Sequence, residues 1–282
     1  MRCEKGFSTH ISKSRNLNLI SQYSNLISKE MNLQQAKFEY LLRLGDSSLI
    51  IGHRLSEWCG HGPILEEDLA MINIALDFVG NTSELLKYAG QVEGKGRDED
   101  ELAYMRDERE FRNLLITEQP NGDFAFTIAR QFLFDTYMFF LYEGLKASKD
   151  ETIAAIAAKS HKEITYHLRH TSEWMYRLGD GTAESHDRLQ HAVNDLWMFT
   201  AELFDMDEVD ALLIKEGVAP DLNKIKTEWE SRVHEVFAKA TLLLPTTTFK
   251  QKGSREGKHT EHLGFLLAEM QYLHRAYPGA KW

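Results

Sequence analysis

The sequence has little of several residue types. Its two cysteines, Cys3 and Cys59, are too few for a disulfide framework or a cysteine-based zinc site. Only 5 prolines and 18 glycines interrupt the 282 residues, which favours long helices over many short strands. No apolar run approaches the roughly 18 residues of a transmembrane helix, so no membrane span is expected.

Net positive charge is also missing. The formal charge is −10, whereas a nucleic-acid binder carries clustered positive charge, so we expect no nucleic-acid partner. The chain has no glycine-rich phosphate loop, dinucleotide-binding G-x-G-x-x-G or G-x-S-x-G nucleophile elbow. Its first residues lack the apolar core of a secretion signal. Hydrophobic residues make up 43%, enough for a sizeable core, and we expect a cytoplasmic protein.

The first 30 residues differ in composition from the rest. They are polar, rich in Ser and Asn and weakly patterned, and Met31 stands just before the first strong helical pattern. We interpret residues 1–30 as an extension that is either a disordered tail or an upstream start assigned in error. Residues 31–282 are predicted to form a single helical domain.

Apolar residues recur at helical spacing through most of this domain. Helices are predicted over residues 35–58, 66–88, 124–145, 150–177, 183–204, 207–216, 221–240 and 260–276. Another is predicted to begin near Asp107 and to stop at the turn 119–122, while 90–101 and 250–258 are charged loops. The helix 66–88 is expected to have one apolar side, made of Leu69, Ile72, Leu76, Val79, Leu85 and Leu86. The predicted fold is all-α, a ferritin-like four-helix bundle with additional C-terminal helices.

The stretch 162–170 nearly contains the Glu-x-x-His pair that binds iron in carboxylate-bridged bundles. Glu163 is followed three residues later by Tyr166, and the histidine comes one place late, at His167. Positions i+3 and i+4 both face roughly one way on a helix, so this pair is not excluded as a ligand set. Asp46, near the middle of the first predicted helix, is a candidate carboxylate ligand, and so is Asp135, which lies inside the strongly apolar run 132–140, where a carboxylate must be paired or ligating.

The second helix does not supply its share of ligands. Where a second pair is needed the chain reads Asp77-Phe78-Val-Gly-Asn81, and Phe does not ligate iron while Asn poorly replaces imidazole. We therefore predict a vestigial site, in which the polar residues form a buried network without metal: Asp46, Asp77, Asn81, Asp135, Glu163 and His167. The alternative is an active diiron monooxygenase or oxidase with an irregular ligand set.

Several stretches together resemble a known family. They are Leu42–Asp46, Glu57–His61, Glu118–Phe124, Tyr166–Leu168 with Arg169, Phe199–Asp205, His259–Gly264 and Leu267–Leu273. The chain from Met31 to Trp282 resembles the structural, non-catalytic, ferritin-like subunits of ring-1,2-phenylacetyl-CoA epoxidase, a multicomponent monooxygenase of phenylacetate catabolism. The family begins at about Met31, so the extension is a departure from it.

The resemblance implies a division of labour. This chain would carry no cofactor and would pair with a catalytic oxygenase subunit that holds the diiron centre. A reductase with a flavin and an iron–sulfur cluster would supply electrons, and this subunit would help bind phenylacetyl-CoA. A rival hypothesis is a helical binding or storage protein with no enzyme partner.

Arginines at positions 106, 109 and 112 are the candidate contacts for CoA. On a helix they would form one stripe, and guanidinium forks match phosphate oxygens. We take Glu110, Phe111, Arg112 and Asn113 as substrate-binding candidates, with a salt-bridged surface as the alternative because acids are interleaved. The basic segment 250–258 is a further candidate contact for CoA phosphates or for the reductase.

Overall fold

A computed structural model describes residues 31–280, and Leu33–Trp282 is one compact unit. The predictions for the extension 1–30 lie outside the described residues. In the described part of this unit every regular element is helical. The α-helices are α2 (Leu33–Ser56), α3 (Leu65–Glu93), α4 (Glu99–Tyr104), α5 (Phe124–Leu145), α6 (Glu151–Gly179), α7 (Ala183–Thr200), α8 (Glu208–Glu216), α9 (Leu222–Lys239), α10 (Glu261–Met270) and α11 (Tyr272–Ala276). The 3₁₀ turns are η1 (Glu108–Glu110), η2 (Leu115–Glu118), η3 (Ala201–Phe204) and η4 (Ser254–Glu256).

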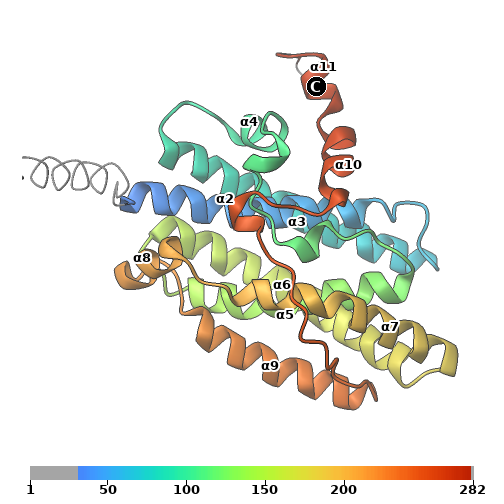
Figure 1. Ribbon diagram of the computed structural model, residues 1–282. Helices are drawn as coiled ribbons and strands as arrows, with labels where there is room; N and C mark the ends of the chain where they lie inside the picture. Colours follow the sequence, from blue (N-terminus) through green and yellow to red (C-terminus); the bar gives the residue numbers. More distant parts are fainter. Residues whose placement is uncertain (1–30, 281–282) are drawn as a thin grey trace, which may run out of the picture. The chain divides into compact units, whose positions relative to one another are not determined.

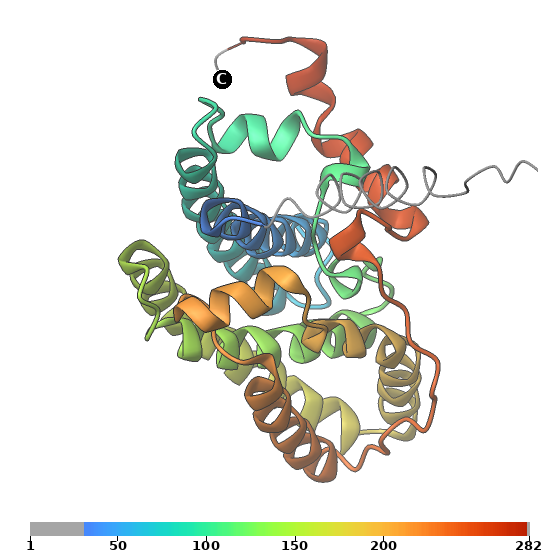
Figure 2. The ribbon, with the colours of Figure 1, turned by 60° about the vertical axis from the view of Figure 1, so that its left-hand side comes forward.

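Four long helices form the centre of this unit. α2 lies along α3, α5 lies along α6, and α3 contacts α6 between the two pairs (Figure 1). α7 and α9 pack on α5, and α8 packs on α2. The chain after α9 runs back along the bundle as an extended segment before it enters α10 (Figure 2). The all-α, ferritin-like prediction is confirmed.

The start of α5 shows how the sequence sets a helix boundary. Gly122 has φ +58°, a value that favours glycine, and it closes the predicted turn. Asp123 is the N-cap, and its side chain accepts a hydrogen bond from the backbone N–H of Phe126 at 2.9 Å. The helix then runs to Leu145 and is buried on nearly all sides, as its apolar composition predicts. Among residues 31–280, no helix is long and apolar enough to cross a membrane.

The segment after α4 differs from the prediction. Residues 107–118 contain only the short turns η1 and η2, so the helix expected from Asp107 is wrong, and α4 begins inside the predicted loop 90–101. Tertiary hydrogen bonds explain the difference. The backbone N–H of Arg112 donates to Asp46 at 2.8 Å, and that of Leu114 donates to the hydroxyl of Ser47 at 3.1 Å. These donors serve α2 instead of a local helical ladder.

The last predicted helix is divided in two at Gln271. The Gln271 side chain donates from Nε2 to the carbonyl oxygens of Ala103 at 3.2 Å and Arg106 at 2.9 Å. Gln271 is therefore buried against the segment that follows α4, and α10 and α11 meet there.

Helix α3 has two apolar faces where one was expected. Leu85 and Leu86 are buried, together with Met71 and Ile74, on the side that packs within the bundle. Leu69 and Leu76, by contrast, are 52% and 62% exposed. The predicted single face is wrong because each helical residue turns the chain by about 100°, which places positions 69 and 76 on the side opposite positions 71 and 74.

Candidate functional site

Two histidine–carboxylate pairs join α3 and α6 at the predicted metal position. His167, on α6, is 1% exposed, and its Nε2 lies 2.9 Å from a carboxylate oxygen of Asp77 on α3. Burial lowers the pKa of His167, and the bond to Asp77 opposes that shift in part. One turn away, His170 makes a matching contact with Glu67 at 2.9 Å. Each histidine therefore faces one carboxylate from the neighbouring helix.

Glu163 lies beside the first of these pairs. It is half-buried, and its pKa is raised by burial and by the negative charge of Asp77. A carboxylate held near another carboxylate is a feature of metal sites, but also of ordinary polar surfaces. Across the described residues 31–280, no group of three or more His, Cys, Asp or Glu side chains is placed to hold a metal ion.

Asn81 sits between four helices and is hydrogen-bonded from each side. Its Oδ1 accepts from the hydroxyls of Ser48 on α2, at 2.9 Å, and Tyr142 on α5, at 2.6 Å. Its Nδ2 donates to the hydroxyl of Ser160 on α6 at 2.5 Å. All these contacts are buried. We call these four residues the amide clasp.

The side chains of the amide clasp can be compared with the ligands that a carboxylate-bridged diiron centre needs. Such a centre takes four carboxylates and two histidines from four helices. Here the position between the four helices holds one amide and three hydroxyls, which satisfy one another. Neutral amide and hydroxyl groups are poor ligands for iron compared with carboxylate and imidazole. The amide clasp is therefore not a ligand set of that kind.

Asp135 is fully buried on α5, and burial raises its pKa well above the ordinary value. Gln131 donates to one oxygen at 2.7 Å, and the hydroxyl of Thr171 lies 3.4 Å from the other. Thr171 also donates to the carbonyl oxygen of His167, one turn before it. Asp135 is thus linked to His167 through Thr171.

Asp46 bonds Arg106 and the backbone N–H of Arg112 rather than any of the other five predicted network residues, and Asn81 likewise bonds only Ser48, Tyr142 and Ser160 among the described residues. Asp46 forms a buried bidentate ion pair with Arg106, whose Nη1 lies 3.0 Å from one oxygen. The Arg106 guanidinium also stacks on the ring of Phe111, with 4.4 Å to the centroid. Asp46 therefore anchors the segment after α4 on α2. No local pattern in the sequence points to this partner, because Arg106 stands 60 residues away.

The substrate-binding candidates lie on that anchored segment. Phe111 and Asn113 are fully buried, so they support the segment from inside. Glu110 is exposed, and its carboxylate accepts from the backbone N–H of Asp107 at 2.8 Å. Arg112 is half-buried and pairs with Glu39 at 3.3 Å. The predicted stripe of three arginines is wrong, because the segment is not helical and Arg106 points into the core.

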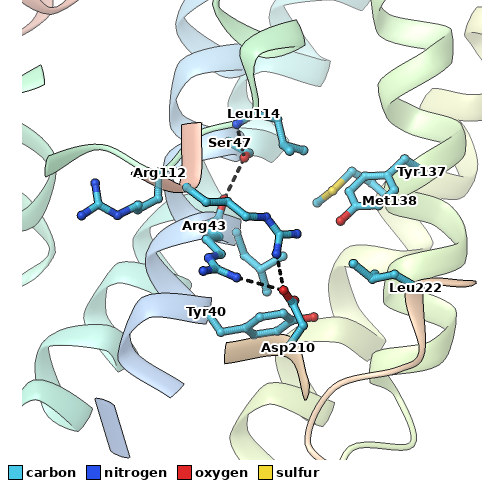
Figure 3. Close-up of a pocket in the computed structure, with 11 residues that line it drawn as sticks. Tyr40, Arg43, Ser47, Arg112, Leu114, Tyr137, Met138, Asp210 and Leu222 are labelled. Atoms are coloured by element: carbon cyan, nitrogen blue, oxygen red, sulfur yellow. Dashed lines mark hydrogen bonds and ion pairs between the residues drawn. The ribbon is translucent and has the colours of Figure 1, made fainter. Parts of the chain in front are cut away.

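Arg112 borders a small pocket between α2, α5, α8 and the segment around η4. The enclosed space is about 30 Å³, room for a water molecule. Arg43 is joined to Asp210 beside Tyr40, with Tyr137 and Met138 across the space (Figure 3). The lining residues are Tyr40, Arg43, Leu44, Ser47, Arg112, Leu114, Tyr137, Met138, Asp210, Leu222 and Arg255.

Charge in this pocket is balanced by internal pairs. Arg43 bonds Asp207 and Asp210, and Arg255 bonds Asp210. Burial opposes ionisation of Asp207, but the bonds to Arg43 outweigh it and lower its pKa to about 2. The hydroxyl of Tyr40 is buried with no protein hydrogen-bond partner among the described residues, and burial raises its pKa well above the ordinary value. Arg43 and Arg255 are paired with the buried Asp210, whereas Arg112 pairs with Glu39, which is more exposed, so Arg112 is the most accessible of the three arginines that line the pocket.

The fold and these contacts define a class, the ferritin-like helical bundles. The chain belongs to a particular family within it, the phenylacetic acid catabolic proteins, whose sequence profile matches residues 26–282. It is 51% identical over 243 residues to one of the subunits of the 1,2-phenylacetyl-CoA epoxidase of Escherichia coli (strain K12). The match covers 86% of this chain and 98% of the relative.

Proposed function

We propose that this chain is the structural, non-catalytic subunit of a cytoplasmic phenylacetyl-CoA 1,2-epoxidase in aerobic phenylacetate degradation. The observation that carries the assignment is the 51% identity to a subunit of that enzyme over 98% of its length. In the proposed complex the iron belongs to a partner oxygenase subunit, and a reductase with a flavin and an iron–sulfur cluster delivers electrons. This chain supports the partner's fold.

The amide clasp supports the non-catalytic part of the proposal. Asn81, Ser48 and Tyr142 are neutral, so this cluster offers none of the negative charge that would balance two iron ions. The hydrogen bonds instead join four helices through neutral groups, which costs less to bury than unpaired charge. A scaffold gains stability from such a network without needing an open metal position.

Metal analysis tests this division of labour. The chain is produced alone in iron-replete medium and also together with the oxygenase subunit of the same complex. We expect no stoichiometric iron in the isolated chain and iron in the complex. Two irons per isolated chain, lost in His167→Ala, would instead establish the alternative, an active diiron monooxygenase or oxidase with an irregular ligand set. Absence of any complex would favour the binding or storage protein.

We further propose that the segment Glu110–Asn113 contributes to phenylacetyl-CoA binding through Arg112 and Glu110, while the buried Phe111 and Asn113 hold the segment in place. Arg112 is the one positively charged residue of this group and is only half-buried, and charge-assisted bonds to phosphate are worth about 1.5–3 kcal/mol. In the assembled enzyme, Arg112→Gln should raise KM for phenylacetyl-CoA roughly 10- to 100-fold. Arg109→Gln, at an exposed neighbour, is the matched control. Equal effects of the two variants would refute a specific role for Arg112.

A further inference from the structure

Helix α3 carries a straight row of exposed apolar side chains. Leu65, Leu69, Leu76 and Val79 are 71%, 52%, 62% and 42% exposed, and Ile72, between them, is half-buried. Large apolar side chains in a continuous row on a protein surface mark an interaction site. We call these five residues the α3 stripe.

The spacing of the α3 stripe indicates the shape of its partner. Successive members are separated by four, three, four and three residues, a period of 3.5. An apolar row with this period runs nearly straight along a helix, and a second helix covers it by packing knobs into holes at a crossing angle of about 20°. The opposite face of α3 is already buried within the bundle, so α3 would lie between two helical layers.

The charged side chains of α3 within the length of the α3 stripe are acidic, and the exposed Lys87 follows about two turns after its last member, Val79. Glu66 and Asp68 flank its first turn, and Asp77 lies between Leu76 and Phe78 on the side facing α6. From α6, Glu163 lies near Asp77. The nearby cation Lys159 is paired with Glu84 at 2.6 Å. An acidic border opposes the pairing of two copies through this face and favours a partner with basic flanks.

We propose that the α3 stripe binds one helix of the iron-bearing oxygenase subunit, a helix with an apolar heptad row flanked by Lys and Arg. This inference rests on the proposed function, which requires such a partner. Beyond the proposed function, it names the surface of this chain that binds the oxygenase subunit and the kind of helix that fits that surface.

Substitutions in the α3 stripe test the surface. The chain is co-expressed with the oxygenase subunit, and the affinity of the pair is measured after purification. Leu76→Ala should weaken the pair roughly 10- to 100-fold, because the leucine loses most of the apolar area that it buries against the partner. Leu69→Lys with Leu76→Lys should abolish co-purification. Both residues are exposed in the isolated chain, so its thermal stability should not change.

A matched control separates the stripe from general hydrophobicity. Leu243 is 75% exposed, lies after α9 and belongs to no such row, so Leu243→Lys should leave the affinity unchanged. The sign of the partner's charge is tested by comparing Leu76→Lys with Leu76→Glu. The lysine variant should bind the partner more weakly, because the proposed partner helix is flanked by Lys and Arg. An equal loss in Leu243→Lys, or stronger binding by the lysine variant, would overturn the proposal.

The failures of the two proposals give different results. If the unsubstituted chain forms no complex with the oxygenase subunit, the proposed function fails. If it forms the complex and the Leu69→Lys, Leu76→Lys variant forms it equally well, only the α3 stripe proposal fails. A stable homodimer of the isolated chain that the double variant dissociates would also overturn it, because the occupant would then be a second copy.

Discussion

The buried ion pair between Asp46 and Arg106 has a large expected effect on stability. Asp46 is 0% exposed and Arg106 is 2% exposed, so removing one partner leaves the other charge without solvent or counter-ion. Breaking such a pair from one side costs about 3–5 kcal/mol. Asp46→Ala also leaves the backbone N–H of Arg112 without its acceptor. We expect its free energy of unfolding to fall by about 3–5 kcal/mol, with a decrease in Tm of roughly 6–20 °C.

Urea denaturation of a double-mutant cycle measures the pair itself. Arg106→Met should cost a similar amount, whereas Asp46→Ala combined with Arg106→Met removes both charges and should cost clearly less than the sum of the two single substitutions. We expect a coupling energy of about 1–3 kcal/mol. The exposed pair between Arg188 and Glu184 is the control, and Arg188→Met should change stability by less than about 0.5 kcal/mol. Strict additivity of the two buried substitutions would refute the reasoning.

Three further predictions concern the polar groups between the helices. Burial lowers the pKa of His167, so as the pH falls the unfolded chain takes up a proton at this histidine before the folded chain does, and the free energy of unfolding should fall below about pH 6.5. When that free energy is measured with urea from pH 7.5 to 5, it should depend less steeply on pH in His167→Gln. An unchanged dependence would contradict the prediction. The raised pKa of Asp135 has the opposite effect on stability. Its contribution to the free energy of unfolding is favourable at low pH and is lost as the pH rises above the pKa of about 4 that an aspartate has in the unfolded chain. Asp135→Asn should therefore stabilise the protein at pH 8 by about 1 kcal/mol or more relative to its effect at pH 4, and a constant effect across that range would contradict the assignment. Tyr142→Phe removes one of two donors to Asn81 and should cost about 0.5–1.5 kcal/mol in thermal or urea unfolding, whereas no loss would show that this bond of the amide clasp does not contribute.

The helices whose ends carry local signals were predictable from sequence. The turn at Gly122 and the cap at Asp123 place the start of α5 correctly, because capping depends on residues a few positions apart. Glycine at the end of α6 likewise marks its boundary, Gly179. The segment after α4 was not predictable, since its backbone donors bond to Asp46 and Ser47, more than 60 residues earlier.

The candidate site shows the same limit. Spacing pointed to Asn81 as a member of the predicted polar network, but not to Ser48, Tyr142 and Ser160, whose hydroxyls surround it. Hydroxyl residues at helix positions carry no spacing signal, so only the packed bundle reveals the amide clasp. The two faces of α3 were merged for a related reason, because periodicity shows that residues are apolar and not what covers them.

The bonds from Gln271 to the carbonyl oxygens of Ala103 and Arg106 have a consequence for biosynthesis. Gln271 follows Arg106 by 165 residues, and ribosomes add roughly 5–20 residues per second, so the two ends of this contact are made roughly 8–33 s apart. During that interval the segment after α4 has no C-terminal cover, although α2 and α3 are complete. The chain therefore finishes folding around residues 103–118 only after its last helices leave the ribosome, and nascent chains that stop before α10 would retain an open segment there.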